Sequence, residues 1–144
     1  MTERLNPFAA GADAMKPWMA LSENVAPSLD HGLRELVKIR ASQINHCANC
    51  LNMHNRDARK AGETEQRLFV LSAWREAPFF TSKERAALAW TEALTQVADK
   101  GAPDDVYAAL EAEFSQQEQV ELTMLINVIN GWNRLAVGFG LFYK

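Results

Sequence analysis

The sequence predicts an all-α protein that folds as one domain. Apolar residues recur at helical spacing over most of the chain, and residues that start or end helices separate these runs. Alternating patterns typical of strands are nearly absent. A chain of 144 residues can bury one core, and this one shows no internal repeat or linker. We therefore expect a single domain over residues 1–144 with about six to seven helices.

Two helices are expected before the cysteines. Pro17 is placed to open the first, over residues 17–26, because proline is favoured at the first helical position. Asp30 is a suitable N-cap for the second helix. Apolar residues then recur along one face of that helix: Leu33, Leu36, Val37, Ala41 and Ile44. Asn45 and His46 continue a helix poorly, so we expect a break there.

Three further helices are expected in the middle of the chain. The first covers residues 48–61, with Gly62 as its C-terminal stop. A short helix follows over residues 64–74, capped by its first threonine. Thr81 and Glu84 form a T-x-x-E capping box that opens the next helix. The apolar side of that helix is expected to contain Ala87, Trp90, Leu94 and Val97.

Gly101 breaks the chain after this helix, and a short helix over residues 104–112 is expected next. Ser115 and Glu118 make a second capping box for a long last helix that reaches about Phe142.

The last helix is apolar around most of its circumference, through Leu122, Leu125, Ile126, Val128, Ile129, Trp132, Leu135 and Val137. Such a helix is normally buried on every side. In a chain this short we expect part of its surface to meet another subunit; the alternative is a central core helix within a monomer. Asn127, Asn130 and Asn133 repeat every three residues, and we expect buried amides that pair with the backbone or a partner chain.

The composition argues against several classes of function. A formal net charge of −3 does not fit a nucleic-acid-binding surface, which needs a basic excess. No apolar run approaches the roughly 20 residues that span a bilayer. The amino terminus lacks a basic region followed by an apolar stretch, so we expect a cytoplasmic protein. Two cysteines in CxxC spacing then indicate a catalytic or metal-binding pair rather than a structural disulfide framework.

Cys47 and Cys50 are one turn apart at the expected start of a helix, close enough for a disulfide. The unpaired N–H groups and the dipole of a helix N-terminus stabilise a thiolate there. His54 follows Cys50 by four residues and lies one turn further along the same face. It can take the Cys50 proton or stabilise the anion that remains.

Glu35 reaches these groups only if the chain reverses. In one straight helix it would lie about 18 Å from Cys47, at about 1.5 Å per residue. A reversal at Asn45 and His46 makes an antiparallel hairpin that brings Glu35 and His54 to the same level. A carboxylate, an imidazole and a thiol in that order form a proton relay. Periodicity places Glu35 off the apolar stripe of its helix, so a solvated charge is the alternative.

These residues give the motif E-x11-C-x2-C-x3-H, from Glu35 to His54. The motif resembles the active site of the AhpD-like alkylhydroperoxidases in the carboxymuconolactone decarboxylase superfamily. Residues 35–76, 84–95 and 126–135 also resemble small single-domain members. The resemblance implies an all-helical fold whose subunits associate as dimers, trimers or hexamers. The decarboxylase that gives the superfamily its name lacks CxxC, so decarboxylation is not expected.

The resemblance implies a thiol-dependent peroxidase. Cys50 would attack the peroxide and become a sulfenic acid, and Cys47 would resolve it to the Cys47–Cys50 disulfide. Glu35 and His54 would be the proton relay. No bound cofactor is implied; an external dithiol, in better-known relatives a lipoyl-bearing adaptor, would restore the thiols. The match departs at one point: fuller members carry a histidine just before the second cysteine, where this chain has Asn49.

Three other functions remain open at this stage. A general thiol–disulfide oxidoreductase would use the same cysteines on another thiol or disulfide. A structural zinc site would draw on Cys47, Cys50 and His54, with His46 as the fourth ligand. In a non-catalytic helical oligomer, the two cysteines would pack as small apolar residues.

Overall fold

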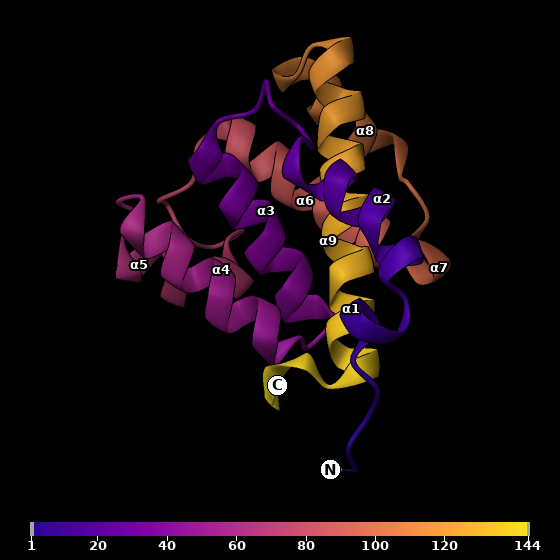
Figure 1. The fold of residues 1–144 in the computed structure, drawn as a ribbon. Coiled ribbons are helices and arrows are strands. Elements are labelled where there is room, and N and C mark those ends of the chain that lie inside the picture. Colours follow the sequence, from indigo (N-terminus) through magenta and orange to yellow (C-terminus); the bar gives the residue numbers. More distant parts are fainter. Residues whose placement is uncertain (1, 144) are drawn as a thin grey trace.

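The structure is a computed structural model that describes residues 2–143, and it is all-α in that range, as the sequence predicts (Figure 1). Its α-helices are α1 (Pro7–Ala10), α2 (Ala12–Glu23), α3 (His31–Ile44), α4 (Ala48–Lys60), α5 (Glu65–Phe69), α6 (Ser82–Thr95), α7 (Val97–Lys100), α8 (Asp104–Glu113) and α9 (Gln116–Phe139). Two short 3₁₀ helices, η1 (Leu71–Ala73) and η2 (Leu141–Tyr143), complete the described chain. The count exceeds the expected six to seven because several elements are single turns.

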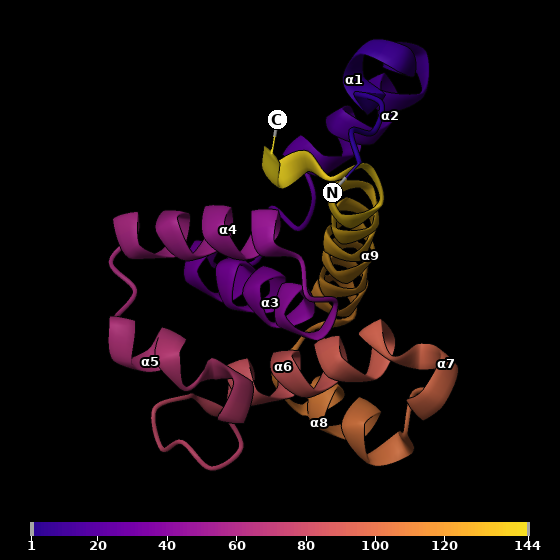
Figure 2. The same cartoon turned by 90° about the horizontal axis from the view of Figure 1, so that it is seen from below.

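Helix α3 is at the centre of the fold. Figure 2 shows it between α4 and α6, and it also packs against α9. Its Leu36, Val37 and Ile39 are at most 1% exposed, because neighbouring helices cover several sides of the helix. The last helix, α9, is not buried all round within one chain, since it exposes Val120 and Val137 by 64% and 51%. The alternative of a helix wholly buried within a monomer is therefore wrong, and the expected contact with another subunit stays a prediction.

The expected caps form with one exception. The Asp30 side chain accepts a hydrogen bond from the Leu33 N–H and starts α3. The box of Ser115 and Glu118 is complete at the start of α9. At α6 the Thr81 hydroxyl accepts from the Glu84 N–H, as expected.

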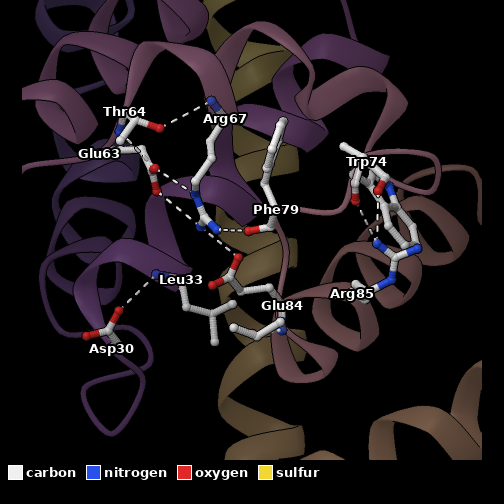
Figure 3. Close-up of polar contacts among 11 residues, drawn as sticks. Asp30, Leu33, Glu63, Thr64, Arg67, Trp74, Phe79, Glu84 and Arg85 are labelled. Carbon is white, nitrogen blue, oxygen red and sulfur yellow. Dashed lines mark hydrogen bonds and ion pairs between the residues drawn. The ribbon is translucent and has the colours of Figure 1, made fainter.

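The Glu84 carboxylate is drawn away from its capping role by Arg67 (Figure 3). The Arg67 guanidinium donates to Glu84 Oε2 at 2.7 Å and to Glu63 Oε1 at 2.8 Å. It also donates to the Phe79 carbonyl. An ion pair between a partly exposed guanidinium and a carboxylate is more stabilising than the hydrogen bond that Glu84 would accept as part of a capping box. The Arg67 contacts therefore connect α5 to the start of α6.

The first and last expected helices have different bounds in the structure. Pro7, capped by the Asn6 side chain, opens α1, while Pro17 lies inside α2, which begins at Ala12. The prediction that Pro17 opens the first helix is therefore wrong; Pro7 occupies that position in α1. Helix α9 ends at Phe139 rather than near Phe142, since Gly140 adopts a left-handed conformation with φ of 63°.

Two middle boundaries also differ. The helix expected over residues 64–74 is split into α5 and η1. The helix opened by Thr81 ends at Thr95, and Val97, expected on its apolar side, is 55% exposed. Gly62, with φ of 96°, does end α4 as expected. No helix among residues 2–143 has the length and apolar character needed to cross a membrane.

Candidate active site

The reversal between α3 and α4 occurs where the sequence predicts it. Asn45 is the C-cap of α3, and His46 takes a left-handed conformation with φ of 54°. The Asn45 amide donates to the side-chain oxygens of Asn130 and Asn133 at 2.9 Å each. Asn133 in turn donates to the Ser42 hydroxyl at 3.0 Å. The turn that precedes Cys47 is therefore held against α9 by hydrogen bonds.

The asparagine repeat on α9 explains this anchoring. Asn130 and Asn133 are buried and hydrogen-bonded, because an unpaired amide in the core would cost free energy. Asn130 pairs with the backbone as expected, at the Ile126 carbonyl, whereas Asn133 pairs with side chains of its own chain. Asn127 is exposed, so the expectation of a buried amide is wrong there. Residues three positions apart on a helix differ in direction by about 300°, so the three asparagines do not share one face. Asn127 consequently points away from the core that Asn130 and Asn133 enter.

Cys47 and Cys50 form a disulfide with their Cα atoms 5.3 Å apart. Cys47 is the N-cap of α4, and its sulfur accepts from the Cys50 N–H at 3.3 Å. The two residues are 1% and 2% exposed and pack against Ala136 and Leu141. The CxxC spacing seen in the sequence thus gives a buried pair at a helix N-terminus.

His54 lies one turn beyond Cys50 on α4 and meets Glu35 on α3. The His54 Nδ1 atom is 3.2 Å from Glu35 Oε2. Because a carboxylate can only accept, Nδ1 carries the proton and Nε2 is left as the acceptor. Glu35 is 2% exposed, so the hairpin interpretation holds and the solvated alternative is wrong. The hairpin therefore brings all four motif residues into one region.

Lys38 completes the charge balance around Glu35. Its Nζ atom is 3.0 Å from Glu35 Oε1, one turn along the same helix. Burial would raise the pKa of Glu35, but the hydrogen bond from His54 and the Lys38 cation outweigh it and lower the pKa to about 2. Glu35 is consequently a permanent anion at neutral pH. It can orient and stabilise the imidazole, while His54 is the group suited to moving a proton.

A cavity of about 680 Å³ opens beside these groups. Its reactive end is lined by Lys38, Asn49, Cys50 and His54. The rest of the wall comes from α9, from the segment before α3 and from η2, and includes Phe8, Met19, Val25, Leu125, Val128, Ile129, Trp132 and Leu141. Of the two cysteines, the lining includes Cys50 alone, so the cavity borders Cys50 and not Cys47.

The zinc set drawn from the sequence does not come together. In the disulfide, neither cysteine sulfur is a thiolate, and His46 is exposed on the turn. Within the described chain, the group with metal-ligand spacing is instead Glu35, His54 and Asp57, whose ligand atoms lie within 4.8 Å of one another. Lys38 already neutralises Glu35, which makes this group a poor cation site.

Two features of the site were missed by sequence reasoning. Lys38 could have been found, since it follows Glu35 by three residues on a helix and that spacing favours an ion pair. The apolar wall of the cavity could not, because residues 6–25 and 125–141 meet the hairpin only in the folded chain. No local pattern connects those segments.

Comparison with known proteins places this fold in a family. The profile of the Carboxymuconolactone decarboxylase family matches residues 12–93. The uncharacterized protein YdfG of Bacillus subtilis (strain 168) is 39% identical over 141 residues, which cover 97% of this chain and 96% of that protein.

Two solved structures extend the comparison. ATU0492 of Agrobacterium tumefaciens, a protein of unknown function provisionally assigned to the antioxidant defence protein AhpD, is 46% identical, with a TM-score of 0.91 over 96% of this chain and 95% of that one. A peroxidase-related protein with an AhpD core from Ralstonia eutropha JMP134 is 18% identical, with a TM-score of 0.79 over 92% of this chain and 72% of that one; it shares the fold. The chain belongs to the carboxymuconolactone decarboxylase family, as an AhpD-like member.

Proposed function

We propose that this protein is a thiol-dependent peroxidase that reduces hydroperoxides through a cycle between the Cys47–Cys50 dithiol and its disulfide. One observation carries the proposal: Cys50, bonded to Cys47 at the start of α4, lines the same cavity as His54, which bonds to the anionic Glu35. A nucleophile, a proton carrier and an orienting carboxylate are the parts that this chemistry needs.

In the first step, His54 Nε2 takes the proton of the Cys50 thiol. The thiolate attacks the terminal oxygen of the hydroperoxide, so that a sulfur–oxygen bond forms and the oxygen–oxygen bond breaks. Cys50 is oxidised to a sulfenic acid, and the organic group leaves as an alkoxide. The alkoxide takes the proton back from His54 and becomes an alcohol.

In the second step, the Cys47 thiol attacks the Cys50 sulfenic acid, which gives the disulfide and one water molecule. The 5.3 Å between the Cα atoms of the pair allows this without a rearrangement of the backbone. We propose that an external dithiol, such as a lipoyl group on an adaptor protein, then reduces the disulfide and is itself oxidised. No bound cofactor takes part in the cycle.

The burial of both sulfurs favours a peroxidase over a general thiol–disulfide oxidoreductase. Each cysteine is at most 2% exposed, so the disulfide of a folded protein has no route to it, whereas a small oxidant reaches Cys50 through the cavity. We further propose a homo-oligomer of two, three or six chains, because α9 exposes Val120 and Val137. A cytoplasmic location fits a dithiol that must be reduced after each cycle.

The test is a single-turnover reaction of the pre-reduced protein with one equivalent of hydroperoxide. Wild type is expected to consume the peroxide and lose two free thiols. The variant Cys50→Ser should consume none, and Cys47→Ser should stop at a sulfenic acid that dimedone traps. Full consumption by Cys50→Ser would refute the nucleophile. An unchanged thiol count in wild type would favour the packing alternative, and stoichiometric zinc in the purified protein would favour the metal site.

A further inference from the structure

The polar groups that line the cavity divide into two kinds. Away from the reactive end, the Asn6 side chain caps α1 through the Phe8 N–H. The Ser22 hydroxyl donates to the Trp18 carbonyl and accepts from Trp132 Nε1. The Asn6 side-chain oxygen and the Ser22 hydroxyl are thus already used within the protein.

At the reactive end, hydrogen-bonding capacity is left over. His54 uses Nδ1 for Glu35, and its Nε2 has no hydrogen-bond partner among the described residues. Asn49, next to Cys50 in the first turn of α4, lines the cavity, and its carboxamide has no hydrogen-bond partner within residues 2–143. An asparagine amide offers two donors and an acceptor, so a half-buried amide without a partner has N–H groups available to a bound molecule.

The size and character of the cavity say what would be bound. The cavity has a volume of about 680 Å³, whereas a water molecule occupies roughly 30 Å³. Hydrogen peroxide is only slightly larger than water, so it would fill a small part of this cavity. Phe8, Met19, Val128 and Trp132 give the far wall an apolar surface. A bulky apolar group is favoured there because its burial removes apolar surface from water.

From this arrangement we infer that Asn49 is a further substrate-contacting residue. Its carboxamide donates a hydrogen bond to the hydroperoxide oxygen that leaves as the alkoxide, and the apolar wall holds the organic group attached to that oxygen. The inference rests on the proposed peroxidase function and adds a donor that lies outside the E-x11-C-x2-C-x3-H motif. It also gives a role to the position where fuller relatives carry a histidine.

The contribution of Asn49 is electrostatic. As the oxygen–oxygen bond breaks, two electrons pass from sulfur to the peroxide and negative charge collects on the leaving oxygen. An N–H donor that bonds to that oxygen in a largely apolar cavity interacts more strongly with the charged leaving oxygen than with the neutral oxygen of the bound peroxide, and so accelerates the step. Asn49 transfers no proton, because His54 returns the one it took from Cys50.

The experiment compares wild type with Asn49→Ala and Asn49→His, using Asn52→Ala as the control. Asn52 lies on the same helix but is exposed. Oxidation of the reduced proteins by cumene hydroperoxide and by hydrogen peroxide is followed by stopped-flow tryptophan fluorescence. Asn49→Ala should slow oxidation by cumene hydroperoxide roughly 10- to 100-fold. Asn49→His, which keeps a donor, should recover much of the rate, and Asn52→Ala should match wild type.

A second measurement separates a role at the leaving oxygen from a structural one. Alkylation of reduced Cys50 by iodoacetamide expels iodide, which needs no such donor, so Asn49→Ala should be alkylated at the wild-type rate. Equal losses in alkylation and in peroxide oxidation would overturn the inference, as would a peroxide rate within twofold of wild type. Failure of wild type itself to consume either peroxide would refute the proposed function and this inference with it.

Discussion

Glu35 and His54 are separated by 19 positions in the chain, yet Oε2 of Glu35 lies 3.2 Å from Nδ1 of His54. The contact crosses from α3 to α4 and is almost excluded from water, with side chains 3% and 11% exposed. A buried carboxylate needs such a partner, and the Lys38 ammonium supplies a second one.

Glu35→Gln should lower the free energy of unfolding by about 3 kcal/mol at pH 7 and by clearly less at pH 3. The pKa of Glu35 is lowered from 4.5 to about 2 in the folded state, so its stabilisation is present above about pH 4.5 and is lost as the pH falls toward 2. Urea unfolding of both proteins at the two pH values measures the difference. An equal difference in unfolding free energy at pH 7 and at pH 3 would show that the charge of the Glu35 carboxylate is not the source of the stabilisation.

His54→Gln should slow peroxide consumption roughly 100-fold or more while the fold is retained, because glutamine keeps a hydrogen bond to Glu35 but cannot carry the proton. Stopped-flow fluorescence of the reduced protein measures the rate, and circular dichroism checks the fold. Glu35→Gln is expected to slow the reaction less, since its amide oxygen still accepts from Nδ1. A His54→Gln rate equal to that of wild type would remove His54 from the proposed relay.

Lys38→Met should raise the pKa of Glu35 toward its ordinary value, because the carboxylate loses the cation 3.0 Å from Oε1. The loss of stability in acid should therefore begin at a higher pH than in wild type, and Lys38→Arg, which keeps the charge, should resemble wild type. Unfolding midpoints in urea between pH 3 and pH 6 test this. Identical unfolding midpoints for Lys38→Met and wild type at every pH would indicate that His54, rather than Lys38, keeps the pKa of Glu35 low.

Gly131→Ala should destabilise the protein by roughly 1–3 kcal/mol, because a Cβ atom at that position on α9 would collide with the indole of Trp18. Trp18 belongs to α2 and packs against Trp132, so the substitution presses the amino-terminal helices away from the cavity. Thermal unfolding and tryptophan fluorescence report both effects.

Gly138→Ala is the matched control on the same helix. A Cβ atom there meets nothing within 4 Å in the described structure, so alanine should leave stability unchanged or raise it by about 0.5–1 kcal/mol. Destabilisation by both substitutions alike would indicate that the helix, rather than the contact with Trp18, responds.

The relative placement of Cys47, Cys50 and His54 could be predicted from a short stretch because its determinants are local. Cys47, Cys50 and His54 share one helix face by spacing alone. The caps at Asp30 and Ser115 depend on groups three residues away, and the structure contains both. Short-range hydrogen bonds of this kind are set within a few residues, and so a sequence pattern can identify them.

Tertiary packing determines features of the site that the periodicity of the sequence does not reveal. Glu35 lies off the apolar stripe of its helix and resembles a surface charge in the sequence, yet it is buried, Lys38 neutralises it and His54 hydrogen-bonds to it. The cavity wall joins Phe8 and Trp132, which come from opposite ends of the chain. The sequence by itself determined most of the helices and the position of the cysteine pair at the start of α4, since those depend on neighbours along the chain. The burial of Glu35 and the shape of the cavity beside Cys50 depend on contacts between distant segments, and only the folded structure decided them.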